Sequence, residues 1–231
     1  MLTLSTLTAN DVDNVNIKGV PISPVKKTDA YHHGNLRAAL IDSALAVIIE
    51  KGAEAVTIRE VAARTGVSHA APYRHFPDKN ALMAAVAKEG FDLMVARMRR
   101  RMAAFPDDPL QRLKFCGIGY IEFALDHPAH YRVMFGPGQD PLRASEALKL
   151  SSAASFQTLF DAITACQAKG VVHGGDPMAM ALSCWAMVHG FSMLVIDGLV
   201  QTRAFHSALP AMMDGLVDSL YFGFRPDREP L

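Results

Sequence analysis

Hydrogen-bonding side chains gather in one short stretch, Ser68 to His75, and their arrangement suggests contact with a polyanion. Pro72 and Phe76 lie one helical turn apart, so together with Val67 we expect them to face a core. The remaining side chains of the stretch then point outward: Ser68, His69, Ala70, Ala71, Tyr73, Arg74 and His75. Donors, small residues and an aromatic ring on one exposed face suit close approach to the major groove of DNA.

Capping residues around this stretch predict two short helices joined by a tight turn. Thr57 and Glu60 form a capping box that opens the first helix, in which the Thr57 hydroxyl accepts from the Glu60 N–H and the Glu60 carboxylate reaches back. Gly66 ends this helix. Ser68 is expected to cap the second helix, which runs to about His75. A helix-turn-helix of this kind is the geometry that places a helix in a DNA groove.

Hydrophobic residues recur at helical spacing through most of the chain, and no sustained alternation typical of strands is present. The sequence therefore predicts an all-α fold of about nine helices. The other expected helices are one carrying Leu36 to Lys51, one from Asp78 to before Pro106, one from Asp108 to about Asp126, one from Pro128 to Gly136, one from about 142 to Lys169, one from Pro177 to Ile196, and a last one carrying Leu209 to Leu220.

The balance of charge hides an asymmetry. The 231 residues carry 23 Lys and Arg against 23 Asp and Glu. Residues 26–101 hold 13 of the basic residues and 8 of the acidic ones, whereas residues 102–231 hold 9 and 13. A basic part followed by an acidic, apolar part indicates two domains with different partners, and the basic part is where a polyanion site is expected. The three scattered cysteines are typical of a reduced, intracellular protein.

Residues 177–196 form a run of twenty residues without a formal charge, which is long enough to span a bilayer. The run contains Ser183, His189 and Ser192, and acidic residues flank both of its ends without a basic cluster. We therefore expect a helix that is buried on all sides inside a soluble helical protein. A membrane anchor is the alternative.

The stretch from Thr57 to Leu82 resembles the DNA-binding domain of the TetR/AcrR family of bacterial one-component regulators. The matching positions are Thr57, Ala62, Gly66, Val67, Ser68, Tyr73, His75, Phe76 and Lys79. Further along, Trp185, His189 and Gly190, together with the stretch from His130 to Gly136, resemble the WHG-type ligand-binding domain of a subset of this family. The resemblance implies a DNA-binding domain over 31–78 and a ligand-binding and dimerisation domain over 79–225, followed by a tail over 226–231. Residues 1–30 are expected to be a disordered leader, because the start of the chain is rich in Thr, Asn and Asp and lacks a long apolar run.

The resemblance also implies roles for single residues. Thr57, Tyr73 and Lys79 would contact phosphate, and Arg59 would reach a base or a phosphate. The residues expected in or beside the major groove are Ser68, His69, Ala70, Arg74 and His75. The last two helices would form a two-fold dimer, as a four-helix bundle does.

Methionine and phenylalanine are concentrated outside the basic part, where they could line a deformable cavity or simply fill the core. The candidate ligand-binding residues are Phe123, Met134, Phe160, Trp185, His189 and Met193. A second feature of the apolar run is a stripe of small residues at helical spacing, which lets another helix approach closely: Ala179, Ser183, Ala186 and Gly190.

These observations predict a cytoplasmic, dimeric transcriptional regulator without a cofactor or metal, most simply a repressor that a small apolar or amphipathic molecule releases from a near-palindromic DNA operator. The alternative is an α-helical enzyme that acts on an apolar substrate with His127, His130 or His189 as its base. The basic run from Arg97 to Arg101 could be a nucleic-acid patch, although the solvated end of a long helix is the simpler interpretation.

Overall fold

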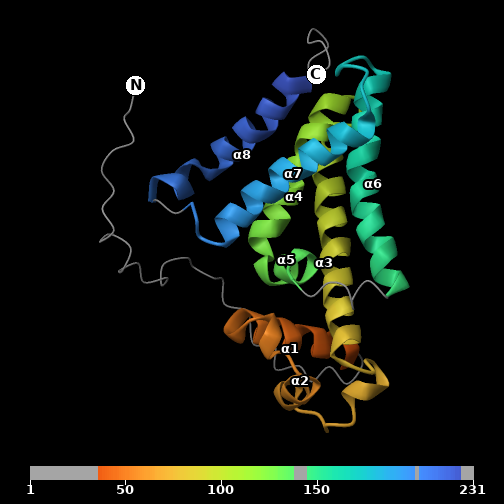
Figure 1. Cartoon of the computed structure of the whole chain (residues 1–231), viewed down its shortest axis with the longest axis vertical. Coiled ribbons are helices and arrows are strands. Elements are labelled where there is room, and N and C mark those ends of the chain that lie inside the picture. The colour runs from red at the N-terminus through yellow and green to blue at the C-terminus, as the bar shows by residue number, and fades with distance from the viewer. Residues whose placement is uncertain (1–35, 138–144, 201–202, 225–231) are drawn as a thin grey trace. The chain divides into compact units, whose positions relative to one another are not determined.

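The computed structural model describes residues 36–137, 145–200 and 203–224, and all regular structure within these ranges is helical (Figure 1). This finding confirms the all-α prediction, with eight α-helices in these ranges against about nine expected. The expected leader and tail lie outside the described residues. The elements are α1 (Leu36–Lys51), the 3-10 turn η1 (Ala53–Ala55), α2 (Ile58–Thr65), the 3-10 turn η2 (Pro72–Arg74), α3 (Lys79–Met102), α4 (Pro109–Asp126), α5 (Pro128–Phe135), α6 (Glu146–Ala168), α7 (Pro177–Ile196) and α8 (Arg203–Phe224).

Aspartate caps begin several helices where the sequence predicts them. The carboxylate of Asp78 accepts from the backbone N–H of Ala81 at 2.8 Å, and Asp108 and Asp176 cap α4 and α7 in the same way. The start of α6 differs from the prediction of about 142. Ser145 caps this helix through the N–H of Leu148, so α6 begins at Glu146.

The long helix α3 packs against α4, α5 and α6 (Figure 1). Its buried face carries Leu82, Val86 and Met94, which share one core with Ile121 of α4. The α3 and α4 backbones approach closely because Gly119 lacks a side chain: a Cβ there would lie 2.9 Å from Cα of Met98. The same core continues into α1 and α2, so α3 links the basic segment to the rest of the fold.

The arginines at the end of α3 are used partly within the protein. Arg97 pairs with Asp126 at 2.9 Å, and Arg101 pairs with Glu122, so both side chains hold α3 against α4. This arrangement supports the interpretation of Arg97 to Arg101 as a solvated helix end.

The apolar helix α7 is not buried on all sides, and this prediction is wrong for the single chain. One face packs inward through Met180, Cys184 and Val188. The opposite face is exposed, and its apolar and small residues are Met178, Ala179, Leu182, Ser183, Ala186 and Leu194. Among the described residues, α7 is the one helix whose length and composition would allow it to cross a membrane.

Candidate nucleic-acid interface and internal cavity

The loop between α2 and η2 begins at Gly66, which ends α2 as the sequence predicts and does so in a left-handed conformation. Gly66 has φ 75° and ψ 28°, a conformation that favours glycine, and its N–H bonds back to the end of α2. At the other end of α2, the Thr57 hydroxyl accepts from the Glu60 N–H at 3.1 Å. The Glu60 carboxylate accepts from Lys51 of α1 at 2.9 Å instead of completing the capping box.

The predicted second helix from Ser68 to His75 is wrong, because the segment forms a turn followed by the short 3-10 helix η2. Successive hydrogen bonds run from Ala71 N–H to Ser68 O and from Arg74 N–H to Ala71 O, which is 3-10 spacing. The reason is Pro72: an α-helix needs its N–H to reach Ser68 O, and proline has none. Consistent with this geometry, no side-chain cap from Ser68 is present in the described segment.

The expected inward and outward faces of the segment are confirmed for most of its residues, whereas Val67 and Ala71 are both half-buried. Pro72 and Phe76 are buried, whereas Tyr73 beside them is 57% exposed. The other predicted groove residues are also exposed: Ser68, His69, Ala70, Arg74 and His75. The tight turn therefore presents its polar side chains to solvent while it stays anchored in the core.

Ion pairs separate the cations of this region into two groups. Arg64 forms a two-pronged salt bridge to Glu50 at 2.7 and 2.6 Å, which lowers the pKa of Glu50 and ties α2 to α1. By contrast, Arg59 and Arg74 are exposed and have no ion pair within the described ranges. Lys79 donates to the backbone oxygen of Glu54 at 3.1 Å, with no carboxylate as its partner. The cations near η2 are thus available to an external anion.

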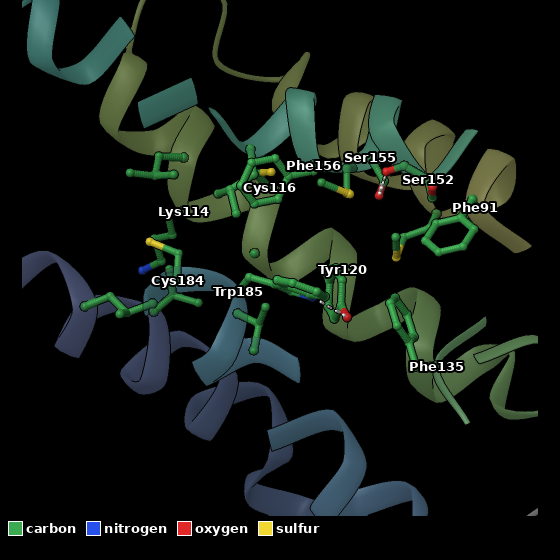
Figure 2. A pocket seen from close by; sticks show the side chains of 18 of the residues that line it. Phe91, Lys114, Cys116, Tyr120, Phe135, Ser152, Ser155, Phe156, Cys184 and Trp185 are labelled. Carbon is green, nitrogen blue, oxygen red and sulfur yellow. Dashed lines mark hydrogen bonds between the residues drawn. The ribbon is translucent and has the colours of Figure 1, made fainter. Parts of the chain in front are cut away.

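A cavity of about 490 Å³ lies among α3, α4, α5, α6, α7 and α8 (Figure 2). An aromatic series crosses it: the ring centroids of Phe91 and Phe135 are 5.5 Å apart, and those of Phe135 and Trp185, and of Trp185 and Phe156, are each 6.3 Å apart. Burial raises the pKa of the lining thiols Cys116 and Cys184 to about 12, so both are neutral. The cavity is lined mainly by apolar side chains of three kinds: aromatic, sulfur-containing and aliphatic.

Only some of the predicted ligand residues line this cavity. Met134 and Trp185 do, whereas Phe160, His189 and Met193 are absent from the lining. Phe123 also faces elsewhere, into the core beside His127, with ring centroids 5.1 Å apart. Packing between helices decides which face of α4, α6 or α7 meets the cavity, and residue type alone does not encode it.

Several lining residues outside the six candidates share a helix face. Along α4, Leu113, Cys116 and Tyr120 recur at helical spacing, and so do Ser152, Phe156 and Leu159 along α6. This periodicity could have identified the faces. It could not have separated a cavity wall from a packed core, because both show the same pattern.

A polar network lies behind one wall of the cavity, and two of its members, Tyr120 and Trp185, line that wall. The hydroxyl of Tyr120 lies 2.9 Å from that of Tyr131 and 3.0 Å from Nδ1 of His189, and it accepts from Nε1–H of Trp185 at 3.3 Å. The Tyr131 hydroxyl lies 2.7 Å from the same Nδ1. Burial raises the pKa of Tyr120 to about 12 and lowers the pKa of His189, so desolvation keeps all of these groups neutral at neutral pH.

Two family models match the chain and together cover more than half of it. Residues 40–86 match the model of bacterial regulatory proteins of the tetR family, and residues 113–220 match that of the tetracyclin repressor-like C-terminal domain. The first match contains α2 and η2, and the second contains most of the cavity lining.

Individual relatives agree with these matches. The HTH-type transcriptional activator FasR of Mycolicibacterium smegmatis is 28% identical over 130 residues, which cover 55% of this chain and little more than half (58%) of that relative. The "Probable acrEF/envCD operon repressor" of Escherichia coli K12 is 24% identical over 203 residues, covering 83% and 87%. A solved structure of a Rhodococcus sp. RHA1 protein of unknown function has 29% identity and a TM-score of 0.70, covering 85% and 99%. The chain belongs to the TetR family of DNA-binding, helix-turn-helix transcriptional regulators.

Proposed function

We propose that this chain is a dimeric, ligand-responsive regulator, and most simply a repressor, that a small apolar or amphipathic molecule releases from a near-palindromic operator. The observation that carries the proposal is an exposed turn around Tyr73, with the cations Arg74 and Lys79, just before and at the start of α3, together with an apolar cavity lined by residues further along the same helix. We assign residues 31–78 to DNA binding and residues 79–225 to ligand binding and dimerisation. A DNA-binding protein with these features acts in the cytoplasm, on the nucleoid when bound.

The unpaired cations support the assignment of the DNA-contacting residues. Tyr73 and Lys79 reach phosphate, together with Thr57. The Thr57 hydroxyl accepts from the Glu60 N–H through a lone pair and keeps its own proton to donate to a phosphate oxygen. Arg59 reaches a base or a phosphate. The residues that enter or border the major groove are Ser68, His69, Ala70, Arg74 and His75.

Two exposed stripes of small residues support a homodimer. On α7 the stripe is the predicted one (Ala179, Ser183, Ala186 and half-buried Gly190), and on α8 it is Ala211, Gly215, Ser219 and Gly223. A Cβ added at any of the three glycines would meet nothing within 4 Å, so space for a partner helix is open there. Exposed apolar surface on both helices, such as Leu182 and Met212, is the surface that an isologous four-helix interface buries.

Helix α3 offers a path between ligand and DNA. Its first residue, Lys79, belongs to the DNA-contacting set, and Phe91, Met94 and Met98 on the same helix line the cavity, beginning about 18 Å further along the axis. The position of α3 sets the distance between the two DNA-contacting turns of the dimer. A ligand that binds more tightly to one position of α3 stabilises the dimer form with the corresponding distance. The change in free energy between the two dimer forms cannot exceed the difference in the ligand's binding free energy to them.

A mobility-shift assay on the DNA upstream of the protein's own gene tests the proposal. The assay needs a salt series and an unrelated competitor duplex, because electrostatic binding alone is not specific. We expect a dimer-sized complex that resists the competitor and is lost when a cavity ligand is added. Equal binding to all duplexes at physiological ionic strength would contradict the proposal. Reporter expression with and without the gene separates repression from activation, since relatives include both kinds.

A further inference from the structure

Each charged side chain that lines the cavity already forms an ion pair with another residue of the protein. At one end, Nζ of Lys114 lies 2.9 Å from Asp218 and 3.6 Å from Asp214. Lys149 is the other lining cation, and it pairs with Glu146 at 3.2 Å. An anionic group that entered would therefore find both lining lysines already paired, and a cationic one would face two lysines against the one lining carboxylate, Asp218.

The polar groups at the aromatic wall are already occupied. The Tyr120 hydroxyl accepts from Trp185 and donates to Tyr131, and its third close contact is Nδ1 of His189, so groups of the protein surround its oxygen. The Nε1–H of Trp185 already donates to the Tyr120 hydroxyl. Gln111 contributes an amide, which carries no charge.

At the end of the cavity near Phe91, two serine hydroxyls remain as acceptors. Ser152 donates its proton to the backbone oxygen of Lys149 at 3.0 Å, and Ser155 donates to that of Ser152 at 2.8 Å. Each hydroxyl oxygen keeps lone pairs, and both residues line the cavity close to Phe91 (Figure 2). A ligand at this end of the cavity is recognised by the hydrogen bond that it donates to one of these two hydroxyl oxygens.

We propose that the cavity takes an uncharged molecule with an elongated apolar body and a hydroxyl group, the apolar part lying along Phe135, Trp185 and Phe156 and the hydroxyl donating to Ser152 or Ser155. This inference rests on the proposed function of the cavity as the effector site. It narrows the effector to neutral alcohols and excludes the carboxylates and quaternary ammonium ions of the same length.

Trp185 is the only tryptophan of the chain and lines the cavity, so its fluorescence reports binding without DNA. The full-length protein is titrated with four probes that share one ten-carbon chain: 1-decanol, decanoate, decyltrimethylammonium and decyl methyl ether. We expect decanol to bind at least about tenfold more tightly than either ion and than the ether, which has no hydroxyl proton. Binding of an ion or the ether as tightly as decanol, or no response to any probe, would overturn the proposal.

Variants test the two parts of the recognition separately. Asp218→Asn removes one of the carboxylates beside Lys114, so decanoate should bind more tightly while decanol is unaffected; the matched control is Asp161→Asn on the exposed side of α6. Ser152→Ala combined with Ser155→Ala should lower the decanol affinity to that of the ether. Unchanged decanoate binding in the first variant, or unchanged decanol binding in the second, contradicts the proposal. Circular dichroism checks that each variant folds.

The outcome is distinguishable from failure of the proposed function. A protein that binds decanol in the fluorescence titration but keeps its operator complex contradicts the release mechanism alone. If the protein binds its operator specifically but its Trp185 fluorescence does not change with any probe, only the proposed ligand class is contradicted.

Discussion

The hydroxyl of Tyr131 lies 2.7 Å from Nδ1 of His189, although 58 residues separate them in the chain. This contact joins α5 to α7, and the Tyr120 hydroxyl completes a triangle with both groups. The neutral tautomer with its proton on Nε2 satisfies the network, because Nδ1 then accepts from Tyr131 while Tyr120 donates to the Tyr131 oxygen. Hydrogen-bonding groups from α4, α5 and α7 thus fix the position of Tyr120 in the cavity wall.

Replacing Tyr131 by Phe should destabilise the protein by about 1 kcal/mol, the net value of one buried hydrogen bond. The loss stays small because the Tyr120 hydroxyl lies 3.0 Å from Nδ1 of His189 and can donate to it instead. Urea unfolding measures the change. The matched control is Tyr73→Phe, whose hydroxyl is exposed and should contribute almost nothing to stability. Equal effects of the two variants would contradict this account of the network.

Stability should fall as the pH drops below neutrality, and His189 should contribute to the fall. Burial lowers the pKa of His189 in the folded protein, so the unfolded chain binds the proton more tightly. The contribution of His189 is therefore full above its ordinary pKa of 6.5 and is lost as the pH falls from there through the lower folded value.

His189→Gln tests this linkage, since glutamine does not titrate. The free energy of unfolding, measured by urea at several pH values, should depend less steeply on pH in the variant than in the wild type. Some dependence remains, because desolvation also lowers the pKa of His127. An identical slope in both proteins would show that His189 is not the responsible group.

Replacing Tyr73 or Lys79 by Ala should weaken binding to every DNA sequence to a similar degree. If each contacts one phosphate, the slope of log affinity against log salt falls by about 1 for the Lys79 variant. Arg64→Ala serves as a comparison, since its charge is already neutralised by Glu50. A salt slope that does not change in the Lys79 variant would remove this residue from the phosphate contacts.

Replacing His69 by Ala should change which sequences bind instead of how strongly all of them bind. His69 is exposed in the turn before η2, and in the proposed complex its side chain would reach base edges. We expect a change of roughly 1–3 kcal/mol in the preference at one base pair. Selection from a randomised operator library measures the preference, and an unaltered profile would exclude His69 from base reading.

Replacing Gly215 by Leu should dissociate the dimer without unfolding the chain. A side chain there meets nothing in the single chain, and leucine is a better helix former than glycine. In a dimer the same side chain would separate the helices that the small residues let approach. Sedimentation velocity over a range of concentrations measures the state, with Ala153→Leu on the exposed face of α6 as the control. A dimer of unchanged strength would place the interface elsewhere.

The sequence predicted the features that depend on near neighbours. The caps at Thr57, Asp78, Asp108 and Asp176 and the left-handed Gly66 are set by hydrogen bonds within a few residues, so spacing alone was enough. It also predicted which side chains of the turn are exposed, because Pro72 and Phe76 mark the buried face. The 3-10 form of η2 could also have been read from Pro72, which removes the N–H that an α-helix requires.

Tertiary structure alone decided the cavity and the exposed face of α7. His189 lies one turn from Trp185, yet only Trp185 lines the cavity, while His189 reaches it through Tyr120. The charge balance at Lys114 needs Asp218 from a helix more than a hundred residues later. Such features depend on how helices pack across the fold, and helical periodicity gives the direction of a face but not what lies opposite it.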